Sequence, residues 1–306
     1  MISNLNQASE AFLANIARVQ RSVDQASRQV SSGKRVNVAS DDPGNIDTIM
    51  QLQTGDTHNR QIQSNLAVVA ADANAADTAL TSATKLMDRA RTLAAQGSSF
   101  SMDASGRQSI ASEVESLLEQ MITISRTTVQ GRYVFGGDQD GSPPYDVDLT
   151  ADNGAARLTN AAATRRVEDA SGGSFAVSKS AQEIFDLRDS DDNLATGNVF
   201  AALNSLRNAL LANDVSQIAA ANGAIQSASD HLYVSQAFYG TVQNRIQDAA
   251  NYADAYSARL KIELGQKQDA DITAAALAIT QGNTELQASF AMQAKMPRTT
   301  LFDFMV

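Results

Sequence analysis

The chain has 306 residues, a formal net charge of −10 and a pI near 4.7. It has no cysteine and no tryptophan, which excludes disulfides, a thiol nucleophile and a thiolate metal site. Lys and Arg are not clustered as phosphate binding requires, so no nucleic-acid partner is expected. No apolar run approaches the ~20 residues of a membrane span, so no membrane insertion is expected.

Residues 5–30 have the apolar spacing of a helix. Their large apolar residues follow one another at intervals of four and three, which is typical of a coiled-coil seam, a narrow line of side chains that packs against a partner helix. The seam residues singled out here are Phe12, Ile16, Val19 and Val23.

A polar stretch from Val30 to Asp47, VSSGKRVNVASDDPGNID, separates this helix from the next. Gly33 can adopt the left-handed backbone conformation that closes a helix. Asp41 or Asp42 can cap the following helix, and Pro43 suits its first turn. The stretch therefore predicts a helix–loop–helix corner.

Residues 43–96 form the longest helical pattern, and residues 107–130 follow it after a turn over 97–106, which predicts an antiparallel hairpin. The 4-3 spacing of the first pattern is unbroken from residue 62 onward. Its seam consists of Ile62, Leu66, Val69, Ala73, Ala76, Leu80, Ala83, Met87, Ala90 and Ala94.

Residues 131–197 differ from the rest because they combine Pro143–Pro144, several glycines and short β-favouring segments. Segments spaced by about ten residues with turn signals between them indicate a small β-rich domain. The predicted strands are 132–135, 155–158, 165–168 and 174–177.

The pattern returns to helix at 199–212 and again from Asp214, a predicted cap, to about 266. Asp269 or Asp271 can cap a last helix, which Pro297 ends. Apolar residues mark a seam on this helix and continue into the chain end: Ile272, Ile279, Leu286, Phe290, Leu301, Phe302 and Phe304.

The predicted fold is mainly α with a β-rich insertion: long antiparallel coiled-coil helices from both chain ends, with a small β domain in the middle. We expect terminal helices at 1–40 and 270–306, a helical rod at 41–130 and 198–269, and an outer β-rich domain at 131–197. A pair of terminal helices has little core of its own and is marginal alone. Neighbouring subunits are therefore expected to order it.

The sequence offers no catalytic constellation, so no enzyme, cofactor or metal site is expected. His58 and His231 lie far apart in predicted helices and form no zinc-binding pair. The acidic segments 138–141 and 189–193 lack the glycine and glutamate positions of an EF-hand loop. The apolar seams could instead bind a membrane surface, but such helices are usually rich in Lys and Arg, which favours packing between helices here.

The corner resembles the signature of the bacterial flagellin superfamily, in which an S-S/T-G-x-R-[IV]-N…D-D motif joins the first two helices. The matching residues are Ser32, Gly33, Lys34, Arg35, Asn37, Asp41, Asp42 and Pro43. Within the superfamily, the G-K-R…S-D-D-P pattern, the segment GRYVFGG at 131–137 and the ending LFDF at 301–304 are most similar to hook-associated proteins of the hook–filament junction (FlgL type).

Two features differ from the junction type. Met296–Pro297 is similar to the V-P near a flagellin C-terminus, and Val306 extends past the usual end. Filament flagellin is therefore the alternative. A signalling coiled coil is a third possibility, against which the β-rich middle argues.

The resemblance implies a structural adaptor of the flagellum, exported by the flagellar type III pathway without a cleaved signal and located outside the cell. It implies a ring of copies between the first hook-associated protein and the flagellin filament, with the terminal helices innermost. It also implies a FlgN-type export chaperone on the C-terminal region, with Ile279, Leu286 and Phe290 as candidate contacts.

Overall fold

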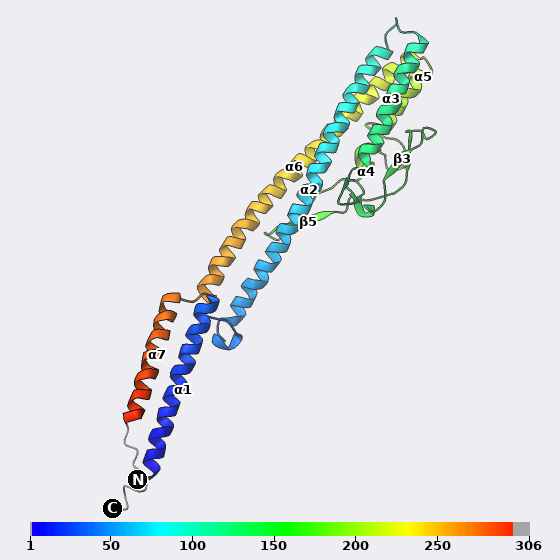
Figure 1. Cartoon of the computed structure of the whole chain (residues 1–306). Helices are drawn as coiled ribbons and strands as arrows, with labels where there is room; N and C mark the ends of the chain where they lie inside the picture. Colours follow the sequence, from blue (N-terminus) through cyan, green and yellow to red (C-terminus); the bar gives the residue numbers. More distant parts are fainter. Residues whose placement is uncertain (1, 296–306) are drawn as a thin grey trace, which may run out of the picture. The chain divides into compact units, whose positions relative to one another are not determined.

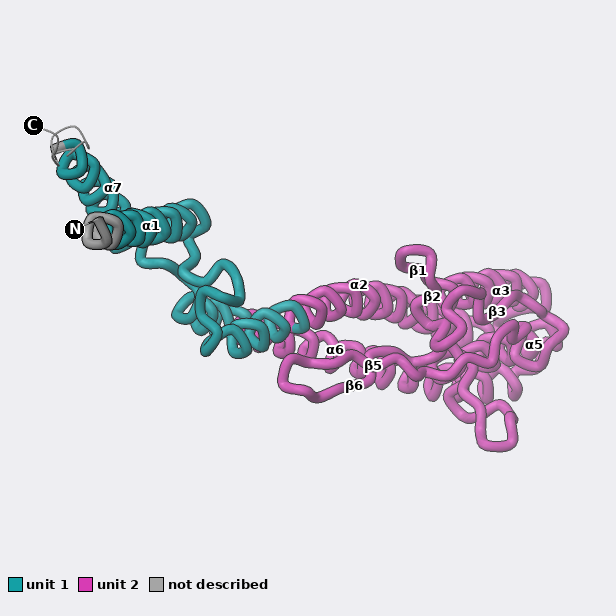
Figure 2. The backbone as a smooth tube through the Cα atoms, turned by 90° about the horizontal axis from the view of Figure 1, so that it is seen from below, with its two compact units in different colours: residues 1–58, 257–306 teal, residues 59–256 magenta. Residues whose placement is uncertain are grey.

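The computed structural model describes residues 2–295 and divides the chain into two compact units. Unit 1 comprises Met1–His58 and Ser257–Val306, and unit 2 comprises Asn59–Tyr256 (Figure 2). Unit 1 thus joins the two ends of the chain, and unit 2 is the continuous segment between them.

Helices dominate the described chain. The long helices are α1 (Ile2–Ser32), α2 (Ile46–Gly97), α3 (Ala104–Ser125), α5 (Val199–Leu211), α6 (Val215–Gln268) and α7 (Ile272–Lys295) (Figure 1). Each agrees within a few residues with a predicted helix, except at the end of α3. The fold class predicted from the sequence is confirmed.

Unit 2 is built on α2 and α6, which run antiparallel and share side-chain hydrogen bonds, with α3 and α5 packed on each other beside them (Figure 1). All ten predicted seam residues of α2 from Ile62 to Ala94 are buried. Half of them are alanine. Asp214 caps α6 as predicted, because its Oδ1 accepts from the backbone N–H groups of Ser216 (2.9 Å) and Gln217 (3.1 Å).

The middle of the chain forms three separate antiparallel hairpins. They are β1 (Thr128–Val129) with β2 (Arg132–Tyr133), β3 (Tyr145–Val147) with β4 (Ala155–Arg157), and β5 (Arg166–Glu168) with β6 (Ser174–Ala176). Short helices complete the elements: η1 (Ala39–Asp41), η2 (Gly137–Gln139) and α4 (Ala181–Phe185). All four predicted strands contain an observed strand, whereas β1, β3 and α4 were not predicted.

The predicted helix over 107–130 is too long, because α3 ends at Ser125. Gln130 and Gly131 adopt positive φ values of 51° and 78°, which makes the tight turn between β1 and β2. Such a turn twists as hairpin strands do. The β-branched residues before it therefore pair as a strand instead of extending the helix.

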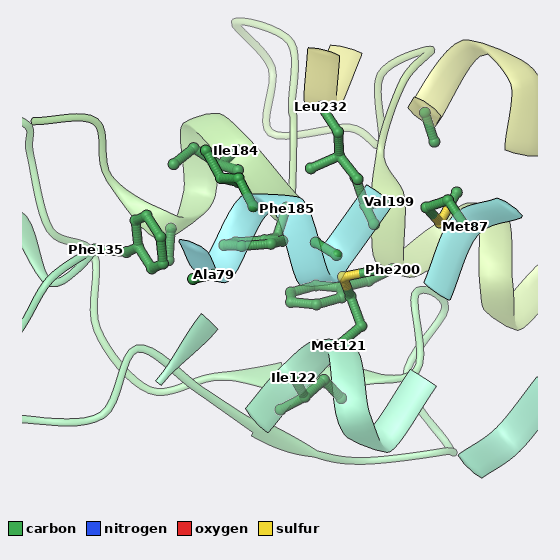
Figure 3. Close-up of a cluster of buried hydrophobic side chains, with 14 of the residues drawn as sticks. Ala79, Met87, Met121, Ile122, Phe135, Ile184, Phe185, Val199, Phe200 and Leu232 are labelled. Carbon is green, nitrogen blue, oxygen red and sulfur yellow. The ribbon is translucent and has the colours of Figure 1, made fainter. Parts of the chain in front are cut away.

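The core of unit 2 includes aromatic rings from β3, α4, α5 and the loop after β2 (Figure 3). Phe135 lies edge-on to Phe185 at 5.4 Å between ring centroids, and Phe185 stacks on Phe200 at 5.8 Å. Tyr145 meets Phe200 edge-on at 5.2 Å. Through these contacts, β3 and α4 pack against α5. The β-rich segment therefore shares one hydrophobic core with the long helices of unit 2.

Candidate assembly site

Gly33 closes α1 and starts the corner segment, defined here as residues 33–45. Its φ of +70° is the left-handed conformation that was predicted for it, and its N–H donates to the Gln29 carbonyl at 2.9 Å. The Ser32 hydroxyl donates to the Arg28 carbonyl at 2.7 Å and accepts from the Lys34 N–H at 3.1 Å. Local hydrogen bonds therefore terminate the helix at a defined residue.

The corner segment pairs with the junction between α6 and α7. The backbone N–H of Arg35 donates to the Gln268 carbonyl at 2.7 Å, and the N–H of Ala270 donates to the Gly33 carbonyl at 3.0 Å. Lys34 and Asp269 form an isolated antiparallel bridge between these bonds. The motif thus holds together two segments of unit 1 that are more than two hundred positions apart in sequence.

The Arg35 guanidinium fastens both sides of this pairing. It donates to the Lys267 carbonyl at 2.7 Å and to Asp42 Oδ2 at 2.9 Å. Asp42 also accepts from the side-chain amide of Asn45 at 2.9 Å. A planar guanidinium can serve both acceptors in fixed directions, which a lysine ammonium would not do.

Asp41 and Asn37 fold the corner segment onto itself. Asp41 Oδ2 accepts from the backbone N–H groups of Asn37 (2.9 Å) and Val38 (3.0 Å), and the Asn37 amide donates to the Lys34 carbonyl at 3.0 Å. Most residues of the recognised motif therefore act in local architecture. The motif brings together no group that could do chemistry.

The predicted cap of the second helix is wrong in position. The helix α2 begins at Ile46, and Pro43 lies in a turn before it. The carboxylates of Asp41 and Asp42 are occupied by the corner segment and accept from no N–H of α2 among the described residues. The Asn45 carbonyl accepts the first helical bond, from Ile49, at 2.9 Å.

Acid should open the corner segment. Hydrogen bonds from the Val38 and Asn37 N–H groups lower the pKa of Asp41, and hydrogen bonds from the Asn45 amide and Arg35 lower that of Asp42. A lowered folded pKa gives stability that is present above the unfolded value, about 3.9, and is lost as the pH falls through the folded value. Carboxyl ¹³C titration should therefore show midpoints below 3.9, with the backbone shifts of residues 34–45 changing over the same range.

The double variant Asp41→Asn, Asp42→Asn is the control for this acid transition. It should remove the change in backbone shifts of the corner segment below pH 4. Titration of both carboxyls at or above 3.9 in the parent chain would contradict the assigned role.

The helices α1 and α7 lie side by side in unit 1 (Figure 1). The predicted α1 residues Phe12, Ile16, Val19 and Val23 are all half-buried. At Gly282 of α7 a Cβ would lie only 2.3 Å from Val23 Cγ2. The two backbones therefore approach closely because this position has no side chain.

The predicted seam of α7 is only partly correct. Ile279 and Leu286 are half-buried, whereas Ile272 is 45% exposed and Phe290 is 52% exposed. Ala275 and Gly282 are the buried residues of this helix. The contact face thus runs through small residues, and the large apolar residues fall at its edge. Leu301, Phe302 and Phe304 lie outside the described residues.

The helix pair leaves large apolar side chains uncovered. Ile272 is 45% exposed, and the side chains of Phe290, Leu13, Leu277 and Met292 are more than half exposed. Within the described part of α1 and α7, Ala26 and Ala275 are the buried apolar side chains. Sequence reasoning missed Leu13, Leu277 and Met292 because they lie off the predicted seams; their being apolar at outward positions was the available signal.

The described residues also offer no cluster of metal ligands and no membrane-spanning helix. They contain no group of three His, Cys, Asp or Glu side chains that could hold a metal ion. No described helix has the length and apolar character needed to cross a membrane. His231 contacts the Glu183 carbonyl through Nε2 at 2.8 Å, a packing role.

Comparisons with known proteins support the recognition made from the corner motif. Residues 3–140 match the family model of the bacterial flagellin N-terminal helical region. The chain is 23% identical over 291 residues to flagellar hook-associated protein 3 of Escherichia coli (strain K12), and the match covers 90% of each chain.

Solved structures show the same fold. A flagellar hook-associated protein structure from Vibrio parahaemolyticus is 18% identical, with a TM-score of 0.64, covering 75% of this chain and all of that one. The flagellar junction protein FlgL from Legionella pneumophila is 14% identical, with a TM-score of 0.53, covering 66% of this chain and all of that one. At these identities the likeness concerns the fold.

Proposed function

We propose that this chain, whose first 140 residues include a flagellin-type N-terminal region, is a structural component of the bacterial flagellum that joins the hook-associated ring to the flagellin filament. The match to hook-associated protein 3 over 90% of both chains supports the hook-associated role. The homologues are structural flagellar proteins, and the described residues contain no group of three His, Cys, Asp or Glu side chains that could hold a metal ion. The proposed work of the chain is mechanical.

Assembly through the terminal helices is supported by one observation above all. The pair α1 and α7 exposes large apolar side chains and buries only small ones. Exposed apolar surface of this kind marks a site of protein contact. We assign the partners as copies of this chain in a ring, the first hook-associated protein and flagellin. A FlgN-type chaperone would cover the C-terminal part before export by the flagellar type III pathway to the outside of the cell.

The corner segment contributes by holding α1 and α7 as a pair. It fixes the ends of both helices through the bonds of Gly33 and Arg35 to Gln268 and Ala270. A subunit could then present two helices to its neighbours as one surface. The motif shared with flagellins is in this view an architectural device for polymer subunits.

A seeding experiment separates the junction role from the alternative, filament flagellin. Purified chain is mixed with short filament seeds, and growth is followed by light scattering and electron microscopy. We expect no long filaments from this chain alone, because an adaptor should add only a limited layer. Extended polymerisation on seeds would favour filament flagellin and overturn the junction assignment.

Phe290→Ala tests the apolar surface. Because Phe290 is 52% exposed in the single chain, its removal should leave monomer unfolding unchanged within about 0.5 kcal/mol. Binding to the hook-associated ring is measured by co-sedimentation. It should fall at least tenfold if the Phe290 side chain fills a pocket in the assembly. The matched control is Phe100→Ala, at a side chain 95% exposed in unit 2. Equal binding by both variants and the parent would contradict this role.

A further inference from the structure

The seam of α2 includes one buried polar residue in addition to its apolar ones. Asn59 lies three residues before Ile62 and continues the 4-3 spacing. Its side chain is 1% exposed, and its Nδ2 donates to the carbonyl oxygen of Ala253 on α6 at 2.8 Å. Its Oδ1 is buried and has no hydrogen-bond partner. Such a residue costs free energy that an apolar residue would not, so stability alone does not explain it.

Contacts along the rest of α2 and α6 show the register in which these two helices pair. Polar side chains bridge α2 and α6 at Gln63–Asp254, Asn74–Gln243, Thr81–Gln236 and Arg91–Gln226. The two residue numbers of every bridge sum to 317, so all four belong to one antiparallel register. The bridges extend over much of the paired length of unit 2.

These bridges specify that register only weakly. Asn74 and Thr81 are seven positions apart, as are their partners Gln243 and Gln236. A slip of one heptad would therefore place Gln236 opposite Asn74, where another hydrogen bond can form. Alanine makes up half of the α2 seam from Ile62 onward. Three of these alanines, Ala76, Ala83 and Ala90, occupy successive heptad positions, so this line of the packing discriminates little between registers.

The buried amide of Asn59 discriminates between registers because the residues one heptad away from Ala253 are larger than alanine. Every helical residue has a carbonyl, but Asn59 can approach one only where the residue it faces is small. Ala253 is followed seven positions later by Leu260 and preceded seven positions earlier by Ile246, and all three are buried. In a slipped register, Asn59 would face a branched side chain, and both polar atoms of its amide would lack partners.

We propose that Asn59, seated against Ala253, is the positioning residue that fixes the register of α2 on α6. Burying the amide costs free energy in every register. The hydrogen bond to Ala253 offsets part of this cost in the observed register, whereas the amide is unpaired in the others. A single polar residue in a coiled-coil seam is a documented means of specifying register at the expense of stability. The four surface bridges then reinforce the register that Asn59 selects.

The experiment uses the full chain, whose lack of cysteine allows thiol pairs to be introduced singly. Gln63→Cys with Asp254→Cys reports the observed register. Gln63→Cys with Gln247→Cys reports a one-heptad slip, because residue 247 lies about 10 Å along the helix from residue 254. Each pair is treated with a bis-maleimide too short to span that displacement. The cross-linked fraction is measured by peptide mass spectrometry.

In the parent chain we expect cross-linking of the first pair and only background for the second. Asn59→Leu should raise the slipped-pair yield at least tenfold while leaving thermal stability equal or higher. This combination separates a register role from ordinary packing, in which stability and register would be lost together. Slipped-pair yields at background in Asn59→Leu and in Asn59→Ala would overturn the proposal.

A second substitution tests the same contact from the other helix. Ala253→Leu fills the space that the amide occupies and should also raise the slipped-pair yield. Ala249→Leu is the matched control, since Ala249 is a buried alanine on α6 four positions before Ala253, whereas the Asn59 amide donates to the Ala253 carbonyl. Equal yields in these two variants would show that overpacking alone causes the slip, and would also overturn the proposal.

Discussion

Asp186→Ala should cause the largest loss of stability of any single substitution considered in unit 2, about 3–5 kcal/mol. The Asp186 side chain is fully buried. One oxygen accepts from the Tyr145 hydroxyl at 3.0 Å and from Arg188 Nε at 2.9 Å. The other accepts from the side-chain amides of Asn153 and Asn198, each at 2.8 Å. Removing the carboxylate leaves four donors without their acceptor, one of them a charged guanidinium.

The Asp186 carboxylate also contributes to the raised pKa of the neighbouring Tyr145 hydroxyl. Burial raises the pKa of Tyr145, and the negative charge of Asp186 raises it further. The tyrosine therefore stays protonated and donates its hydrogen bond over the whole range in which proteins are studied. Tyr145→Phe removes one of four bonds and should cost only about 1 kcal/mol.

Tyrosine absorbance measures the loss of stability that Asp186→Ala causes. All six tyrosines of the chain lie between residues 133 and 256, within unit 2, and there is no tryptophan. Denaturant unfolding followed by this signal thus reports unit 2 alone. The control is Asp191→Ala, at an exposed aspartate five positions further along, which should change stability by less than about 0.5 kcal/mol. A similar effect for both aspartates would show that the network has no special weight.

How far the sequence predicted this protein depended on the range of the interactions. The α2 seam was predicted fully, because a heptad repeat states within one helix which face is buried. Gly33 and the Asp214 cap were predicted for the same reason, since their partners lie within four residues. Local chemistry determines such features, and it can be read without knowing the rest of the fold.

The parts that were missed depend on distant partners. Asp186 was not singled out, because its donors at Tyr145 and Asn153 come from β3 and a neighbouring loop whose position the sequence does not state. The contact face of α7 was predicted only in part for a related reason. Its spacing favoured large residues, but close approach to α1 selected Ala275 and Gly282. Sequence patterns that count apolar residues overlook a face made of small ones.

Gly282→Ala should separate α1 from α7, although alanine is the better helix former. In most helices this change stabilises by about 1 kcal/mol. Here the added Cβ would lie 2.3 Å from Val23 Cγ2 and 3.6 Å from Val19 Cγ1. A β-branched side chain in a helix has little freedom to turn away, so the backbones must part. Overpacking of this kind costs about 1–3 kcal/mol, and this helix pair has little other core.

The expected result is faster hydrogen exchange in α1 and α7 with no change in the tyrosine signal of unit 2. Gly223→Ala in α6 is the matched control, because a Cβ there meets no atom within 4 Å, and it should stabilise the chain slightly. Val23→Ala removes the obstructing methyl group, so the double variant with Gly282→Ala should recover much of the lost protection. This rescue gives a coupling between the two positions that independent sites would not show. If both glycine variants slow exchange alike, the close approach at Gly282 does not hold the pair together, and the large residues at its edge must do so instead.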